Sequence, residues 1–137
     1  MLTTPNFVAG GDIYPCRFVT LVNSGTAGIG MTVLQAGVGA VAEGDFVIGI
    51  SQEGTKKFDS ALAAASGDQL EVSGPGHYAL VTCGAVNIAA GVQVKAGLDG
   101  KALVVAADKD CVGGLALTAG LVGEKFWVLV NPYKISM

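Results

Sequence analysis

Charged side chains are scarce in this sequence, and basic side chains are the scarcer kind. Asp, Glu, Lys and Arg together make up 14% of the 137 residues, whereas a typical soluble domain contains about 25%. Eight Lys and Arg residues stand against 11 Asp and Glu residues, which gives a net charge of -3, and Arg17 is the single arginine. Because binding to nucleic-acid phosphates or to an anionic membrane needs clustered cations, the sequence predicts neither partner.

Histidine and cysteine are too few and too widely spaced for a metal or redox site. His77 is the single histidine, and Cys16, Cys83 and Cys111 form no CxxC pair. An odd number of distant cysteines indicates reduced, buried thiols, which fits a protein made in a reducing cytoplasm. We therefore expect no metal and no cofactor.

Motifs of catalysis are absent as well. The sequence has no GxSxG motif, and no glycine-rich segment continues into a Lys-Ser or Lys-Thr pair that would bind phosphate. His77 follows a Gly-Pro-Gly turn, where we expect it to face solvent or to pack on Tyr78. We expect no enzymatic activity; a small hydrolase that pairs His77 with Cys83 or Cys111 is the alternative.

Glycine is abundant, with 21 residues, while proline is limited to 4 and hydrophobic residues reach 51%. This composition predicts short β-strands joined by tight turns. Such strands are typical of a small β-sandwich or barrel of antiparallel strands, so we predict an all-β (mainly β) fold with a single β-domain at residues 16–137. An alanine-rich stretch allows at most one short helix, near residues 59–66. The predicted strands are residues 17–22, 31–35, 45–51, 69–73, 77–83, 91–95, 101–106, 111–118 and 125–131.

Residues 1–15 contain two prolines and a Gly-Gly pair, which excludes a helix there. We predict an extended N-terminal arm or a short edge strand. An extended arm can add a strand to a sheet of another protein, which is a recurrent mode of binding. Packing of this segment on its own domain is the equal alternative. The candidate contact residues are Thr3, Thr4, Pro5, Asn6, Phe7 and Val8.

Two segments of the sequence resemble each other. Residues 33–54 and 102–120 both run from a strand through a small-residue turn to a Val-x-Gly motif, in which Gly49 corresponds to Gly114. Two hairpin-like units that pack face to face would explain the likeness, and chance similarity in a chain rich in Gly, Ala and Val is the alternative. A glycine inside a strand also indicates a bulge or a close backbone approach, and the Asp99-Gly100 pair predicts a hairpin turn.

The strand near the C-terminus has two apolar faces. Phe126, Val128 and Val130 are expected on one face, and Trp127 and Leu129 on the other. Both faces are therefore expected to be covered, the second one by the same domain or by a neighbouring subunit. Phe126, Trp127 and Leu129 are the candidates for core or trimer contacts. The low content of charged residues also favours contact with other subunits, because such contact would bury part of a surface that has few charges.

The order of several segments resembles the small decoration, or cement, proteins of tailed-phage heads. These segments are PCRFVTL, TVLQAG, VIGISQEGT, ASGDQLEVSGPG, GAVNIAAGVQVKAGLDGKALVVAADKD and VGGLALTAGLVGEKFWVLV, within residues 14–130. The resemblance implies a homotrimer on the outer surface of the virion that binds the major capsid protein and stabilises the shell. It implies synthesis in the host bacterial cytoplasm and no catalysis. The alternatives are a carbohydrate-binding or adhesive surface module, and a tail or connector protein of the same virus.

Overall fold

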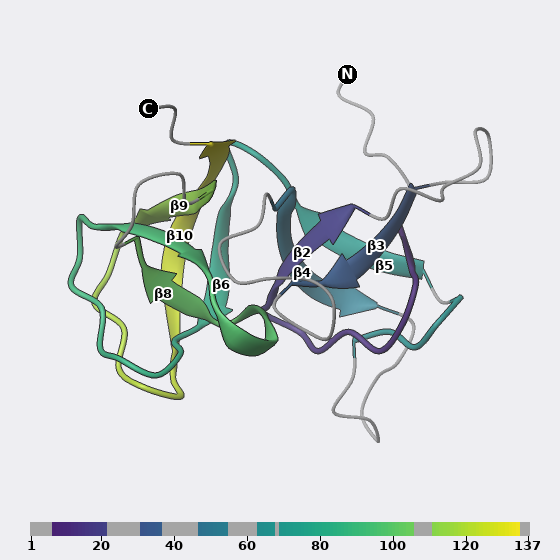
Figure 1. Ribbon diagram of the computed structural model, residues 1–137, viewed down its shortest axis with the longest axis horizontal. Coiled ribbons are helices and arrows are strands. Elements are labelled where there is room, and N and C mark those ends of the chain that lie inside the picture. Colours follow the sequence, from purple (N-terminus) through teal and green to yellow (C-terminus); the bar gives the residue numbers. More distant parts are fainter. Residues whose placement is uncertain are drawn as a thin grey trace.

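The computed structural model describes residues 7–21, 31–36, 47–54, 63–67, 69–105 and 111–134. Strands dominate these ranges and form two lobes that lie side by side (Figure 1), which confirms the predicted all-β class. A single-turn 3-10 helix, η1 (Leu98–Gly100), is the helical element among the described residues. The strands are β1 (Phe7–Ala9), β2 (Phe18–Leu21), β3 (Met31–Gln35), β4 (Gly49–Gly54), β5 (Gln69–Ser73), β6 (Tyr78–Thr82), β7 (Gln93–Ala96), β8 (Ala102–Val104), β9 (Cys111–Ala116) and β10 (Lys125–Lys134).

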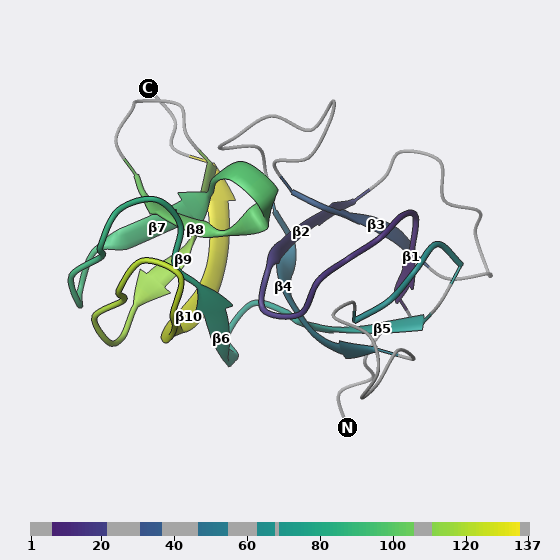
Figure 2. The same cartoon turned by 90° about the horizontal axis from the view of Figure 1, so that it is seen from below.

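Strands β1 to β5, which we call the first unit, form a closed barrel in the order β1-β3-β2-β4-β5 (Figure 2). Strands β1 and β3 are parallel, and the other pairs are antiparallel. Val19, Val33 and Val72 come from different strands and are buried together inside the barrel. The predicted strands at residues 31–35 and 69–73 coincide with β3 and β5.

Strands β6 to β10, the second unit, form a sheet in the order β6-β10-β9-β7-β8. A parallel bridge between Cys83 and Ala102 joins the two edges of this sheet. The hairpin from β7 to β8 turns at Asp99 and Gly100, whose φ angles are 58° and 72°. The Gly97 N–H donates to the Lys101 carbonyl over 2.7 Å, so the loop holds three residues, Leu98, Asp99 and Gly100. The hairpin predicted at the Asp-Gly pair is confirmed, with a three-residue loop in place of a two-residue turn.

The two units have the same topology and the same register. β1 to β5 correspond to β6 to β10 in order, and the parallel pair β1/β3 corresponds to the Cys83–Ala102 bridge between β6 and β8. Gly49 lies opposite Val19 in the first unit, and Gly114 lies opposite Val94 in the second. The likeness predicted around these two glycines is therefore a structural equivalence, and it extends over all five strands of each unit.

The connections between strands repeat as well. Ile13 pairs with Ala64 in the first unit, and Ile88 pairs with Gly120 in the second. The Gly67 N–H donates to the carbonyl of Ala9 over 2.7 Å, and the Gly123 N–H donates to that of Cys83 over 3.1 Å. Both glycines have positive φ, 88° and 80°. A hairpin-sized repeat was expected, whereas the repeated element is a whole five-stranded unit.

The helix allowed near residues 59–66 does not appear in the part of that stretch that the structure describes. The backbone N–H groups of Ala63 and Ala64 both donate to the Ile13 carbonyl, at 2.8 and 3.2 Å, and the Ile13 N–H donates back to Ala64 at 2.9 Å. These strand-like bonds use the donors and acceptors that a helix would need. Residues 55–62 lie outside the described residues.

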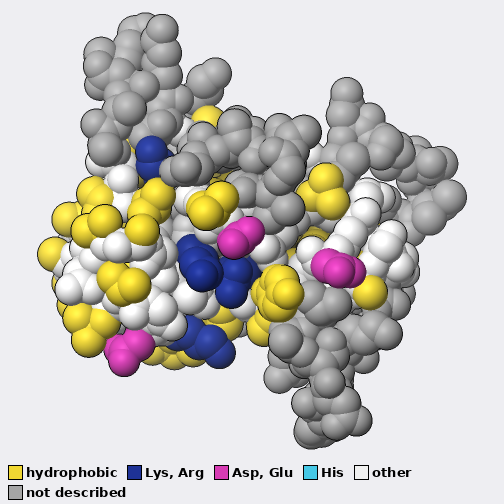
Figure 3. Space-filling view, turned by 60° about the horizontal axis from the view of Figure 1, so that its bottom comes forward, with side chains coloured by type: hydrophobic (Ala, Val, Ile, Leu, Met, Phe, Trp, Pro, Cys, Tyr) yellow, Lys and Arg dark blue, Asp and Glu magenta, His cyan; other side chains and the backbone are white. Residues whose placement is uncertain are grey.

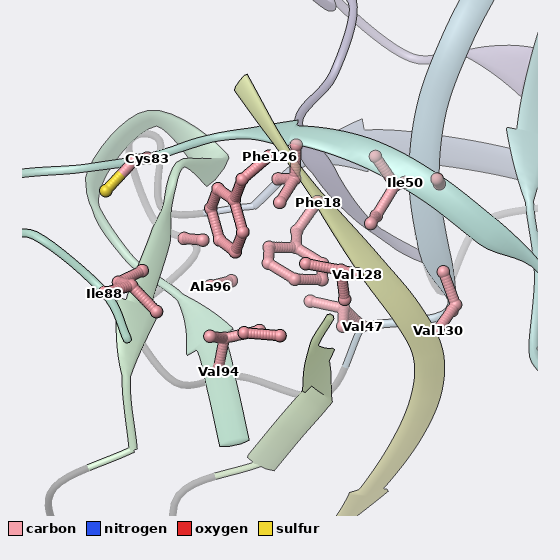
Figure 4. Close-up of a cluster of buried hydrophobic side chains, with 14 of the residues drawn as sticks. Phe18, Val47, Ile50, Cys83, Ile88, Val94, Ala96, Phe126, Val128 and Val130 are labelled. Atoms are coloured by element: carbon pink, nitrogen blue, oxygen red, sulfur yellow. The ribbon is translucent and has the colours of Figure 1, made fainter. Parts of the chain in front are cut away.

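One hydrophobic core joins the two units. Phe18, Val47 and Ile50 of the first unit are fully buried in a cluster with Phe126 and Val128 of the second (Figure 4). The Phe18 ring lies against Gly113, where a Cβ atom would approach it closer than 3.0 Å. Because Gly113 on β9 has no side chain, the second unit has room for the Phe18 ring at this point.

Backbone and side-chain hydrogen bonds reinforce this junction. The Thr82 N–H donates to the Cys16 carbonyl over 2.9 Å, and the Arg17 guanidinium donates to the Asp99 carbonyl over 3.0 Å. The guanidinium also lies 5.3 Å from the centre of the Tyr14 ring, within the range of a cation–π contact.

Substitution of the corresponding glycines tests the repeated geometry. An added Cβ would lie well under 3.0 Å from the Ser73 carbonyl oxygen at Gly49 and from the Leu129 carbonyl oxygen at Gly114. We expect Gly49→Ala and Gly114→Ala each to lower the free energy of unfolding by about 1–3 kcal/mol, because the neighbouring strand must move. Gly74→Ala is the control, since a Cβ there meets nothing within 4 Å. Denaturation showing equal stability for all three variants would contradict the prediction.

Candidate interaction surface

The alternation predicted for the C-terminal strand is confirmed, but its two faces differ in cover. Phe126, Val128 and Val130 are buried in the shared core. Trp127 remains 46% exposed, and Leu129 is half-buried. Phe126 is therefore a core residue, whereas Trp127 and Leu129 lie on the outer face of the second unit.

Apolar side chains from three neighbouring strands gather on this outer face. Leu80 lies opposite Trp127 in the register of β6 and β10. Leu129 lies opposite Tyr78 on β6 and opposite Leu115 on β9, and directly opposed residues share one face of a sheet. The Leu117 N–H donates to the Trp127 carbonyl over 2.9 Å and continues the face beyond β9. We call the set the Trp127 face, and its members are Tyr78, Leu80, Leu115, Leu117, Trp127 and Leu129.

The first unit is an internal reference for this face. Strands β4 and β5 pair in the same register as β9 and β10. Ile50 lies opposite Ser73, and the equivalent pair in the second unit is Leu115 and Leu129. The next pair along, Ser51 with Val72, is equivalent to Ala116 with Val128. The counterparts of Trp127, Leu117 and Leu129 are therefore, in that order, Glu71, Gln52 and Ser73.

All three counterparts are polar, and Glu71 is exposed. The same fold is thus built with polar side chains at these positions, so strand pairing and core packing do not require Trp127, Leu117 and Leu129. A contiguous group of exposed apolar side chains is typical of an interaction surface.

The loops at one end of the second unit are also more apolar than their counterparts in the first unit. Val86, Leu121 and Val122 are 61%, 55% and 53% exposed, and the Val122 N–H donates to the Asn87 side-chain oxygen over 2.9 Å. By the equivalence of Gly67 and Gly123, the counterparts of Leu121 and Val122 are Ala65 and the exposed Ser66. Hydrophobic side chains are spread over the lobe of the second unit in Figure 3, and basic side chains gather where the lobes meet. The second unit therefore carries the more apolar described surface.

The structure places two of the six predicted N-terminal contact residues within the barrel. Phe7 lies opposite Met31 on β3 and Leu70 on β5, and Val8 lies between the same strands. Both side chains are half-buried, and Phe7 packs against the core of the first unit. This part of the predicted arm packs on its own domain, which is the alternative that the sequence left open. Thr3, Thr4, Pro5 and Asn6 lie outside the described residues.

The sequence also left a Cys–His pair open, and the structure separates Cys83 from His77. Cys83 is buried in the core, and its thiol donates to the Val86 carbonyl over 3.2 Å. His77 is exposed in the turn at the other end of β6. Six residues of extended chain span about 20 Å, so this pair cannot share a proton.

The thiols lie in positions that suppress their reactivity. Cys16, Cys83 and Cys111 are reduced and buried. Burial raises the pKa of the Cys83 thiol, and burial also raises the pKa of the Cys16 thiol, although Lys125 and Arg17 oppose part of that effect. Among the residues that the structure describes, no three His, Cys, Asp or Glu side chains gather as metal ligands. No helix within those ranges is long and apolar enough to cross a membrane.

Comparison with known proteins identifies the fold. No protein-family profile and no curated protein matches this sequence. Among solved structures, the head fiber gp8.5 N base in bacteriophage phi29 matches with a TM-score of 0.62 and 16% sequence identity, over 96% of this chain and 96% of that chain. The chain is similar in fold to a phage head-fiber base. The match spans both units of this chain.

Thiol labelling tests the description of the cysteines. The thiolate is the reactive form, and burial disfavours it at Cys16 and Cys83. We expect none of the three thiols to react rapidly with a disulfide reagent in the folded protein at neutral pH, and all three to react after unfolding in urea. Rapid labelling of one thiol in the folded protein would show that this thiol is accessible to solvent and would contradict its burial.

Proposed function

We propose that this protein is a structural protein of a bacteriophage virion that lies on the outer surface of the head and performs no catalysis. The observation that supports the proposal most is the fold, which matches a phage head-fiber base over nearly the whole of both chains. The order of segments in the sequence, which resembles head decoration proteins, points to the same place in the virion.

The finer proposal is a decoration, or cement, protein that acts as a homotrimer and binds the major capsid protein. A low content of charged residues, 14%, and the exposed Trp127 face both support assembly with other subunits. Binding at three-fold or quasi-three-fold points would hold neighbouring capsid subunits together against the pressure of packaged DNA. The protein is made in the bacterial cytoplasm and needs no cofactor, nucleic acid or membrane for this role.

We propose that the N-terminal segment makes the contact with the capsid. Phe7 and Val8 pair with both β3 and β5. The segment of residues 1–6 is therefore joined to the barrel at Phe7. Thr3, Thr4, Pro5 and Asn6 are then the contact residues, and an extended segment would bind by adding a strand to a capsid subunit.

The proposal predicts the solution mass and the binding of purified protein to heads. We expect light scattering on a size-exclusion column to give a mass of three times 13.7 kDa. We expect the protein to sediment with empty phage heads that lack it and to raise the temperature at which those heads break. Heads that neither bind the protein nor gain stability would overturn the decoration role.

Truncation tests the N-terminal contact separately. A deletion of residues 1–6 removes the proposed contacts and keeps Phe7, whose pairing with Met31 and Leu70 closes the barrel. We expect this variant to keep the wild-type mass and unfolding temperature and to lose binding to heads by about 100-fold. A variant of equal length with residues 1–6 replaced by Gly and Ser separates the role of these side chains from that of chain length. Unchanged binding by the truncated protein would rule out the contact.

A carbohydrate-binding or adhesive module is the second candidate, and one observation favours it. Tyr78 and Trp127 are 69% and 46% exposed, and they are diagonal neighbours on β6 and β10. Exposed aromatic side chains on the surface of a sheet can stack on sugar rings. Since Trp127 is the single tryptophan, oligosaccharide binding at this face would change the fluorescence of the protein directly.

A further inference from the structure

We infer that the Trp127 face is the surface on which another copy of this chain packs. The inference rests on the proposed self-assembly and names the surface that performs it. It assigns assembly to the second unit, whereas the proposed capsid contact precedes β1 of the first unit in the sequence.

The junction inside the chain provides the precedent. Phe18 and Ile50 lie opposite each other on β2 and β4, on the outer side of the first barrel. Both are fully buried because the second unit covers them. In the second unit their counterparts are Gln93 and Leu115, which also lie opposite each other, and Gln93 is exposed. The outer face that is an interface in the first unit is thus open in the second.

On the outer face of the first unit, the side chains that the second unit covers are apolar, as at Phe18 and Ile50, and the exposed side chain at Glu71 is polar. In the second unit the position of Glu71 is taken by Trp127. Leu115, a member of the Trp127 face, holds the position of Ile50, which a unit of the same fold covers in the first unit. A second copy of the chain supplies such a unit.

The chemistry of the face suits contact with another copy of this chain. None of its six members is charged, so two copies bring no like charges together, and Tyr and Trp are enriched in the centres of protein interfaces. Glu124 and Lys125 are exposed at the edge of the face and carry opposite charges. A polar rim around an apolar centre is the usual anatomy of a protein–protein interface.

Exchange of counterpart residues between the units tests the inference. Trp127→Glu introduces the residue that stands at the equivalent position of the first unit, and Leu117→Gln does the same on the same face. Leu98→Gln is the matched control, because Leu98 is 66% exposed in the β7–β8 turn. Light scattering over a dilution series measures association, and circular dichroism with thermal unfolding verifies that each variant is folded.

We expect the wild type and Leu98→Gln to share one oligomeric mass, and Trp127→Glu to weaken association by about 100-fold or more. We expect Leu117→Gln to weaken association as well. This second variant keeps the test valid if Trp127→Glu does not fold. In the wild-type oligomer, acrylamide should quench Trp127 poorly, and dilution should restore quenching. A folded Trp127→Glu variant with the wild-type mass, or a monomeric wild type with fully quenched Trp127, would overturn the inference.

The proposed function can fail independently of this result. Wild-type oligomers that dissociate with Trp127→Glu but do not bind phage heads would overturn the decoration role and leave the assigned interface standing. Conversely, binding of heads by a protein whose mass is unchanged in Trp127→Glu would leave the decoration role standing and remove this interface.

Discussion

The burial of Phe18 between the two units is the interaction on which the rest of the structure depends. The first barrel closes through strand pairing, whereas the edges of the second sheet meet at one bridge, between Cys83 and Ala102. Phe18 comes from the first unit and fills part of the second unit's core, against Gly113. A fully buried aromatic side chain contributes several kcal/mol to stability. Without the second unit, Phe18 and Ile50 on the outer side of the first barrel would be exposed, and without the first unit the second would lose part of its core.

Duplication of one five-stranded unit explains the architecture, and divergence of the two copies explains the surface. Strand order, register and the positive-φ glycines Gly67 and Gly123 are shared, because backbone pairing demands them. Outward-facing positions are under no such demand. Glu71 and Trp127 occupy the same place in the two copies, so the fold is conserved within the chain while the surfaces differ. The first unit carries the N-terminal segment, and the second carries the apolar face.

Local sequence signals predicted much of the fold because they act over a few residues. The strands β3 and β5, the Asp99-Gly100 turn and the correspondence of Gly49 with Gly114 were all predicted from the residues. The short helix that the sequence allowed near residues 59–66 does not form at Ala63 and Ala64, whose backbone pairs with Ile13. A bridge between residues about fifty positions apart leaves no local signal, so alanine content suggested a helix where long-range pairing decided otherwise.

The sequence by itself determined the fold class, most strand positions and the apolar character of both faces of β10. Turn chemistry and side-chain alternation carry that information, because each depends on neighbours along the chain. Only the tertiary structure decided that Phe126 is core while Trp127 is exposed, that Phe7 is a barrel residue, and that the repeat covers a whole unit. These outcomes depend on which distant strands meet, and on which face a second unit is already present to exclude water.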